Sequence, residues 1–461
     1  MKILGIETSC DETAAAVVED GRKILSNVVV SQIDIFAEYG GVIPEVAARS
    51  HLEAMMPVVS KALADAGCGW ENIDAIAVTH APGLLGSLLI GTLTARTLAI
   101  LHNKPLYAVH HLKSHVYANW LRDGEPESVF SSAGLENPGT SYAGRPGEPS
   151  PSETNLSASS GIYVPGFSNH FMLQKRQAQT LPAFPLLALV ISGGHTQILY
   201  MRGHNQFEII GTTRDDAVGE CFDKVAKILG LPYPGGPSIA KAAEGGDAEK
   251  YRLPHPKIPG LDFSFSGLKT AVLRTVQKEV GVPISYPSHK LAELLSEQQV
   301  VDFAASFQKT AIDILLEKLQ IALEMHPEIR SVVFAGGVSA NRKLRGRFEA
   351  VFSSVGLESS STSYTGSRAE PPLNGERKEP SENEWGEPVR TVRNIRVENS
   401  NQNFMLQKRQ VSNLSTYFPF PSLSGDNGAM VAAAAYYEIQ AGAEPTDPYK
   451  LNIYPRVSIG K

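Results

Sequence analysis

The chain has 461 residues, of which 42% are apolar, and its 42 Lys and Arg against 48 Asp and Glu give a formal net charge of −6. This length exceeds the size at which a single hydrophobic core keeps growing, so two domains are expected. The negative net charge excludes nucleic-acid binding by overall electrostatic attraction. A nucleic-acid partner would have to bind a local patch of Lys and Arg. The three cysteines form no C-x-x-C pair, which fits a reducing cytoplasm.

The first part of the chain predicts a three-stranded meander followed by an apolar helix. Residues 2–8, 13–19 and 23–31 alternate in the manner of strands, and a polar turn separates the first two. The most apolar run, residues 84–101, is interrupted by Arg96. It therefore predicts a buried helix of a soluble protein rather than a membrane span.

A pair of histidines follows the next predicted strand, residues 106–109. His111 and His115 are spaced i, i+4, so a helix places both imidazoles on one face, where they can hold a divalent cation. The best third ligand is Asp426, in residues 425–429, which open a late helix. The alternative is a helix start at which both histidines only make hydrogen bonds.

Two long segments repeat one another. Residues 129–142 and 351–364 are identical at ten of fourteen positions, and both segments end in the same seven residues, FMLQKRQ. Between these ends the sequence is rich in Ser, Gly, Pro, Glu and Asn and has no helical or strand period, which predicts two inserted, largely disordered surface loops. The alternative is that their QKRQ ends bind a partner.

The meander returns after the first inserted loop. Residues 186–191, 195–201 and 207–213 predict strands, and a helix is expected over 216–229. This duplication predicts two related lobes that face each other across a nucleotide cleft. Gly193 and Gly194, between the first two of these strands, would let the backbone approach a phosphate closely.

Two further glycine pairs occur in this half of the chain. Residues 335–342 follow a strand at 331–334 and open a helix, where an anion is favoured, and Gly235-Gly236 would pass flat beneath a base or ribose. Asp223 could accept a ribose hydroxyl proton. The alternatives are plain tight turns and a surface pair of Asp223 with Lys224. The sequence contains no Walker-type phosphate loop.

Taken together, the motifs strongly resemble the bacterial TsaD family of tRNA N6-adenosine threonylcarbamoyltransferases. They are GIETSCDET at 5–13, GGVIPE at 40–45, HxxxH at 111–115, SGGHT at 192–196, DFSFSGLKT at 262–270 and DN at 426–427. The resemblance covers the whole core and stops at the two inserted loops. It implies an α/β fold of the actin-like, sugar-kinase and heat-shock-ATPase (ASKHA) class, with two duplicated lobes around a nucleotide cleft.

The resemblance divides the chain into five segments. They are an N-terminal lobe at 1–124, an inserted loop at 125–184, a C-terminal lobe at 185–350, a second inserted loop at 351–418, and a metal-ligand loop with a returning helix at 419–461.

The resemblance also implies a reaction and its site. The family transfers the threonylcarbamoyl group of threonylcarbamoyl-AMP to N6 of adenosine 37 in tRNAs that read codons beginning with A, and AMP leaves. The residues that it implies are the metal ligands His111, His115 and Asp426, the substrate loop Val190, Ile191, Ser192, Gly193 and Gly194, and the adenylate contacts Asp223, Gly236 and Asn341. The metal is iron, favoured as Fe²⁺, or zinc. Asp11 or Glu12 is the candidate for the general base, with turn capping as the alternative.

Partners follow from the same resemblance. Besides tRNA and threonylcarbamoyl-AMP, they are an inactive TsaB-like paralogue and a small TsaE-like ATPase, with no membrane involved. Residues 84–101 and the helix expected over 51–66 could form the face that meets the paralogue, with core packing as the alternative.

Three other functions compete with this interpretation. A metalloprotease would use both histidines, but residues 112–114 lack the glutamate base that an H-E-x-x-H enzyme carries. A small-molecule kinase of the actin-like fold would leave the histidine pair unexplained. A non-catalytic scaffold of the same fold would have no need of both histidines, Asp426 and the glycine turns.

Overall fold

The computed structural model describes residues 1–122, 181–353, 414–457 and 459. The chain divides into one unit of residues 1–352 and 413–461 and a second unit of residues 353–412. The predicted inserted loops at 125–184 and 351–418 lie mostly outside the described residues, and the fold below is that of the first unit.

The first sheet has five strands in the order β3-β2-β1-β4-β5, with β1 antiparallel to β2 and parallel to β4. Its strands are β1 (Lys2–Glu7), β2 (Glu12–Glu19), β3 (Lys23–Ser31), β4 (Ala75–Ala81) and β5 (Leu106–His110). The predicted meander is therefore confirmed, and its first two strands end and begin at the polar turn that carries Asp11 and Glu12.

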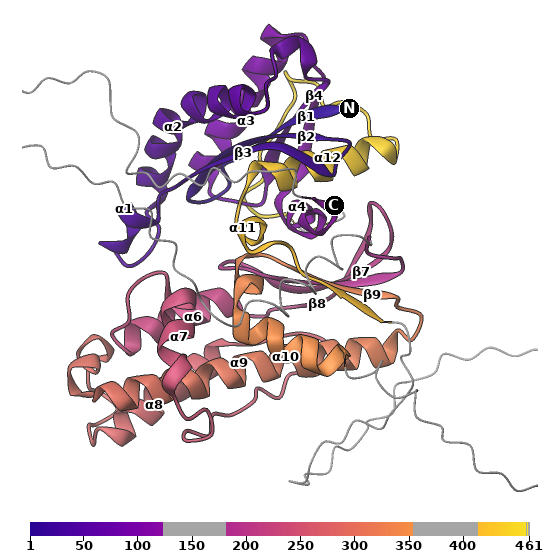
Figure 1. Ribbon diagram of the computed structural model, residues 1–461. Coiled ribbons are helices and arrows are strands. Elements are labelled where there is room, and N and C mark those ends of the chain that lie inside the picture. Colours follow the sequence, from indigo (N-terminus) through magenta and orange to yellow (C-terminus); the bar gives the residue numbers. More distant parts are fainter. Residues whose placement is uncertain (123–180, 354–413, 458, 460–461) are drawn as a thin grey trace, which may run out of the picture. The chain divides into compact units, whose positions relative to one another are not determined.

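Helices cover both faces of this sheet (Figure 1). They are α1 (Ile33–Ala37), α2 (Pro44–Asp65), α3 (Leu85–Leu101), α4 (His111–Tyr117) and α12 (Gly428–Gln440). Alternation along β1 explains the arrangement, because Leu4 and Ile6 pack in the cluster of α2 and α3, whereas Ile3 packs in that of α4 and α12.

The second sheet repeats the first. Its order is β10-β9-β6-β7-β8, with β6 antiparallel to β7 and parallel to β9, as β1 is to β2 and β4. Its strands are β6 (Leu186–Ile191), β7 (Thr196–Gly203), β8 (Gln206–Thr212), β9 (Ser331–Ala335) and β10 (Ser415–Tyr417). The identical strand order in two consecutive halves confirms the duplicated actin-like α/β fold.

A second group of helices covers the outer face of this sheet. They are α6 (Val218–Ile228), α7 (Gly235–Ala242), α8 (Ser266–Glu279), α9 (Glu297–Met325) and α10 (Arg342–Ser353), and the short α11 (Pro421–Ser424) precedes α12. The side chains of β6 divide between two clusters: Leu187, Leu189 and Ile191 face these helices, whereas Leu186, Ala188 and Val190 join the cluster of α4 and α12. Helices α4 and α12 therefore lie between the two sheets (Figure 1).

Two sequence expectations are wrong in this part of the molecule. Residues 415–417 were placed in the second inserted loop, but they form β10, whose backbone pairs with β9. The helix at 84–101 was expected to be buried, but α3 exposes one side, on which Leu85, Leu89 and Leu93 lie. An apolar helix without a polar stripe gives no period from which its solvent-facing side can be identified.

None of the described helices is both long and apolar enough to cross a membrane.

Candidate metal centre

The two histidines lie at the start of α4, immediately after β5. His110 ends the strand and caps the helix, because its Nδ1 accepts a hydrogen bond from the backbone N–H of Leu112 at 3.2 Å. Its Nε2 lies 3.3 Å from the carbonyl oxygen of Val457, which ties the carboxyl-terminal segment to the same corner. This capped start fixes the helix face on which His111 and His115 lie, and both are buried.

Asp426 reaches the same place from the other end of the chain. Asn427 caps α12 by accepting a hydrogen bond from the N–H of Met430 at 2.9 Å, so Asp426 stands just outside the helix. The first residue of α12 packs against β1 at a point where both elements carry a glycine. A Cβ on Gly5 would collide with the carbonyl of Gly428, so the two elements can approach this closely only because Gly5 has no side chain.

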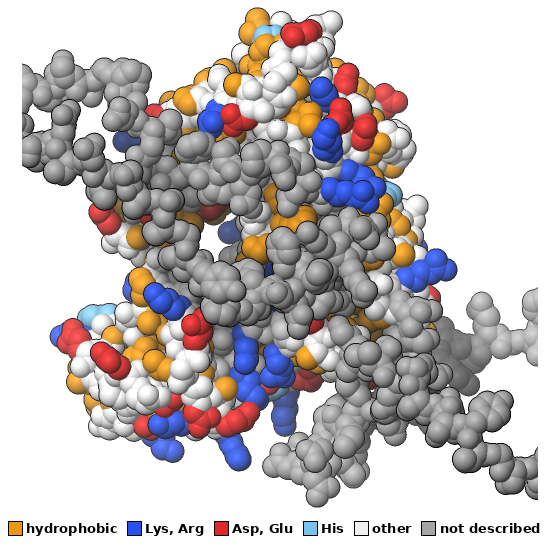
Figure 2. Space-filling model, in the orientation of Figure 1, with side chains coloured by type: hydrophobic (Ala, Val, Ile, Leu, Met, Phe, Trp, Pro, Cys, Tyr) orange, Lys and Arg blue, Asp and Glu red, His pale blue; other side chains and the backbone are white. Residues whose placement is uncertain are grey.

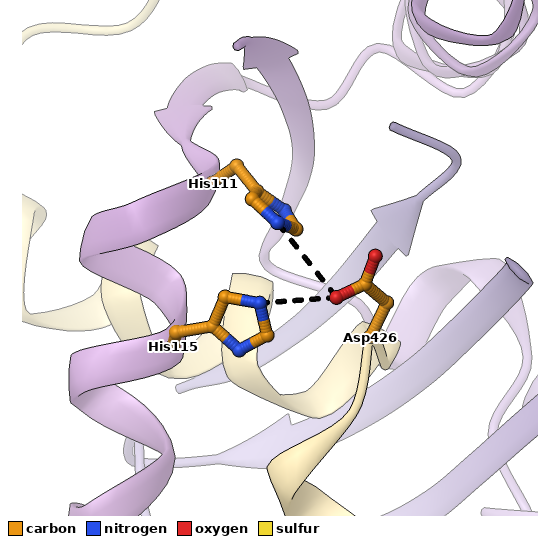
Figure 3. Close-up of side chains that lie close together, drawn as sticks. All are labelled: His111, His115 and Asp426. Atoms are coloured by element: carbon orange, nitrogen blue, oxygen red, sulfur yellow. Dashed lines mark ion pairs between the residues drawn. The ribbon is translucent and has the colours of Figure 1, made fainter. Parts of the chain in front are cut away.

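The three side chains converge (Figure 3). Nε2 of His115 lies 3.0 Å and Nε2 of His111 lies 3.7 Å from the same carboxylate oxygen, Oδ1 of Asp426. One ligand atom of each residue lies within 4.8 Å of the other two. Residues more than 300 positions apart in the sequence thus form one cluster.

The electrostatics of the cluster are those of buried opposite charges. Burial alone would lower the pKa of His111, but the carboxylates of Asp426 and Glu7 outweigh it and raise this pKa to about 9. Burial likewise opposes ionisation of Asp426, but His111 and His115 hold its pKa at about 2. The carboxylate is therefore available as an anionic ligand at neutral pH.

The donor set fits a divalent transition metal. Two imidazole nitrogens and one carboxylate oxygen are the ligands that zinc and non-haem iron take in catalytic sites, where further positions stay open for substrate. The Nδ1 atom of His111 is hydrogen-bonded to Glu7 at 3.2 Å, which leaves Nε2 facing the other ligands. The residues thus fit the predicted centre, and metal binding itself stays a prediction.

The turn with Asp11 and Glu12 lies beside this cluster. Burial and the neighbouring carboxylates of Asp11 and Asp426 raise the pKa of Glu12 well above its usual range. The carbonyl of Asp11 accepts a hydrogen bond from the N–H of Gln32, which extends the pairing of β2 with β3 by backbone atoms alone.

The predicted substrate loop is the turn between β6 and β7. Val190 and Ile191 are fully buried strand residues, so only their backbone can face a ligand. Gly193 and Gly194 stand at open space, since a Cβ on either would meet no atom within 4 Å. Oγ of Ser192 accepts a hydrogen bond from the N–H of His195 at 3.1 Å, which closes the turn.

The three predicted adenylate contacts lie on separate elements. Asp223 of α6 accepts a hydrogen bond from the N–H of Gly235 at 2.7 Å, and Gly236 stands at open space. Asn341 caps α10 by accepting from the N–H of Leu344, and it donates to Gln308 at 2.8 Å. Burial raises the pKa of Asp223, against the opposing effect of the hydrogen bond from Gly235, and the charge of Asp11 adds to the rise.

Sequence reasoning missed several residues that border the centre. The sequence motifs contain Glu7 and His195 but assign them no role. Burial, together with His111 and His115, lowers the pKa of His195 to about 4. His51 was noted only as the end of an expected helix, yet its Nε2 donates to the carbonyl of Cys10 at 2.9 Å. An acid inside an apolar strand was the one available signal for Glu7.

The sequence of the chain is similar to that of one known protein family. The chain matches the family described as "TsaD: tRNA N6-adenosine threonylcarbamoyltransferase" over residues 23–138 and 167–369. A tRNA N6-adenosine threonylcarbamoyltransferase of Symbiobacterium thermophilum is 38% identical over 459 residues, which are 99% of this chain and 97% of that protein. One of Dehalococcoides mccartyi is 44% identical over 346 residues, 75% of this chain and 83% of that protein.

Among solved structures, the activator of 2-hydroxyisocaproyl-CoA dehydratase from Clostridium difficile, with bound ADPNP, aligns with a TM-score of 0.40 and 11% identity over 97% of this chain and 100% of that chain. The family assignment rests on the sequence matches. The chain belongs to the TsaD family of tRNA N6-adenosine threonylcarbamoyltransferases.

Proposed function

We propose that this protein transfers the threonylcarbamoyl group from threonylcarbamoyl-AMP to N6 of adenosine 37 in tRNAs that read codons beginning with A. The new bond joins N6 to the carbamoyl carbon, the bond from that carbon to the phosphate oxygen breaks, and AMP leaves. The observation that carries the proposal is the convergence of His111, His115 and Asp426 beside the turn with Glu12, in a chain of this family.

The residues of the chain divide the work by position. The open glycines of the turn after β6 offer backbone N–H groups to the AMP phosphate, and Asp223 and Asn341 stand ready for its ribose and base. Glu12, with its raised pKa, accepts the proton that N6 loses. Of the two candidates, we propose Glu12 for this role because burial and neighbouring carboxylates raise its pKa.

A metal held by His111, His115 and Asp426 would supply a Lewis acid for the charge that develops on the carbonyl and the leaving phosphate. Iron and zinc both suit this donor set, and iron is the one that we propose. The metalloprotease alternative is disfavoured, because Leu112 occupies the position at which such an enzyme carries its glutamate base.

The paralogue partner has a suitable surface on the first lobe. Leu85, Leu89 and Leu93 of α3 follow one another along its exposed side, and Leu52 and Met56 of the neighbouring α2 are exposed as well. Figure 2 shows apolar side chains at the surface over these helices. We propose that a second chain of the same fold, the TsaB-like paralogue, covers this face with apolar side chains of its own.

The tRNA needs a local basic surface, and α10 offers one. Arg342 and Lys343 are exposed and directly follow Asn341 of the proposed adenylate site. Figure 2 shows Lys and Arg gathered over α9 and α10. We propose that these side chains neutralise phosphates of the tRNA backbone.

The experiment that tests this function uses a strain depleted of its own threonylcarbamoyltransferase. Complementation with the wild-type chain should restore threonylcarbamoyl-adenosine, measured by mass spectrometry of tRNA nucleosides. The double variant His111→Ala, His115→Ala should restore none while keeping its thermal unfolding transition, because it removes two of the three ligands. Full restoration by the double variant would contradict the metal assignment, and no restoration by the wild type would contradict the function.

A further inference from the structure

Glu7 is a fully buried carboxylate at the end of β1, and the proposed reaction makes no use of it. We propose that Glu7 is a positioning residue: it accepts the Nδ1 proton of His111 and thereby keeps the Nε2 lone pair of that imidazole directed at the metal. This inference rests on the proposed metal centre and deepens it.

Both carboxylate oxygens of Glu7 accept hydrogen bonds, and one of them also lies beside His111. Its Oε1 accepts a hydrogen bond from the N–H of Ser9, and its Oε2 accepts one from the hydroxyl of Thr79, both at 2.5 Å. The same Oε2 lies 3.2 Å from Nδ1 of His111. The hydroxyl of Ser9 also lies 3.2 Å from Nδ1. An ionised carboxylate oxygen only accepts and a hydroxyl oxygen can accept, so a hydrogen on Nδ1 serves both contacts.

The tautomer of His111 follows from this contact. When a bound cation displaces one of the two protons of His111, the neutral ring carries its hydrogen on one nitrogen only, and a hydrogen kept on Nδ1 leaves Nε2 with a free lone pair. That Nε2 faces Asp426. Without the carboxylate, the ring could carry its hydrogen on Nε2 and would then present a donor to the cation.

His115 offers an internal comparison. Its Nε2 also faces Asp426, at 3.0 Å, but its buried Nδ1 has no hydrogen-bond partner. The two imidazoles are therefore supported unequally. A carboxylate that receives the second N–H of a ligating histidine raises the basicity of the ligand and fixes its ring, so His111 is the ligand whose geometry is set before the metal arrives.

A glutamine cannot replace Glu7 in this arrangement. If its amide oxygen faces Ser9, its NH₂ group faces His111 and forces Nδ1 to accept, which places the hydrogen on Nε2. If it is turned the other way, its NH₂ group meets the N–H of Ser9. Both orientations lose an interaction that the carboxylate makes, and the first one turns the ligand away from the metal.

The test is titration of the metal-free protein with Co²⁺ alone, followed by visible absorption and by competition with a chelator of known affinity. The variants are Glu7→Gln and a matched control, Glu438→Gln. Glu438 lies on α12 and pairs with Lys113 of α4 at 3.2 Å, so the control removes another carboxylate that contacts α4 without touching a ligand. We expect Glu7→Gln to weaken Co²⁺ binding about 10- to 100-fold and to shift the absorption band, and the control to leave both unchanged.

The outcomes are distinguishable. Equal Co²⁺ affinity of wild type and Glu7→Gln would overturn the role of Glu7 and leave the metal centre standing, whereas no binding by the wild type would contradict the metal centre itself. If Glu7→Gln does not fold, ¹⁵N NMR of the Zn²⁺-loaded wild type decides. A His111 that carries its hydrogen on Nδ1 supports the proposal, and one that binds zinc through Nδ1 overturns it.

Discussion

Among single residues, the buried His51 fixes the turn that carries Glu12 through a hydrogen bond to its backbone. The carbonyl of Cys10 accepts hydrogen bonds from Nε2 of His51 at 2.9 Å and from Oγ of Ser87 at 3.1 Å. Because Nε2 of His51 donates, its Nδ1 accepts, and Thr13 and Gln32 lie at 2.8 and 3.3 Å from it. Burial lowers the pKa of His51, against the smaller opposing effects of the Cys10 carbonyl, Glu7 and Asp11.

This histidine predicts an acid-side loss of stability. Its pKa is lowered in the folded chain from an ordinary 6.5, so below pH 6.5 the unfolded chain binds a proton that the folded chain does not, and folding weakens as the pH falls. The slope for one group reaches at most about 1.4 kcal/mol per pH unit. We expect the free energy of unfolding in urea to fall less steeply between pH 6.5 and 5 in His51→Gln, which cannot titrate, than in the wild type. Parallel losses in both proteins would contradict this assignment.

At the scale of elements, a buried arginine joins the chain on either side of the second predicted inserted loop. Arg345 of α10 donates to the carbonyl of Ser339 at 2.6 Å, and its Nη2 donates to the carbonyl of Pro419 at 2.9 Å and to Oγ of Ser424 at 3.0 Å. These bonds connect the turn before Asn341 with the segment that leads to Asp426. Asp426 is therefore positioned by contacts inside the described core, although the repeated sequence FMLQKRQ ends only sixteen residues before it, at Gln410.

The exposed side of α3 is the surface proposed for the paralogue, and its role can be tested by substitution. Leu89 is 43% exposed on α3, and Leu294 of the second lobe is 44% exposed, so each can receive a charge with little effect on the core. We expect Leu89→Glu to weaken association with the TsaB-like paralogue at least about tenfold, because a charge would have to be desolvated in an apolar interface. Leu294→Glu should bind normally in the same sedimentation or titration experiment. Equal binding by both variants would place the interface elsewhere.

For the molecule as a whole, the sequence alone was sufficient to predict the duplicated fold. Both meanders alternate clearly, and the strands 23–31 and 186–191 were predicted with the observed bounds. The sequence was not sufficient for β10, because three residues are too short to display a period and their pairing with β9 is a tertiary contact.

The candidate site was predictable only where local spacing carries the information. The i, i+4 spacing of His111 and His115 predicts that they share one helix face, and the residues around Asp426 predict a helix start. The supporting residues, Glu7 and His51, have no such pattern. Their roles depend on the approach of α12 and α2 to the first sheet, which no local rule specifies.

On the proposed function, His111, His115 and Asp426 hold a metal that this transferase requires. The most direct measurement is the threonylcarbamoyl-adenosine content of tRNA after incubation with threonylcarbamoyl-AMP, the accessory proteins and either chelator-treated or metal-reloaded protein. We expect product with the reloaded wild type, little or none after chelation, and no recovery on reloading of Asp426→Ala. Equal product before and after complete removal of the metal would contradict it.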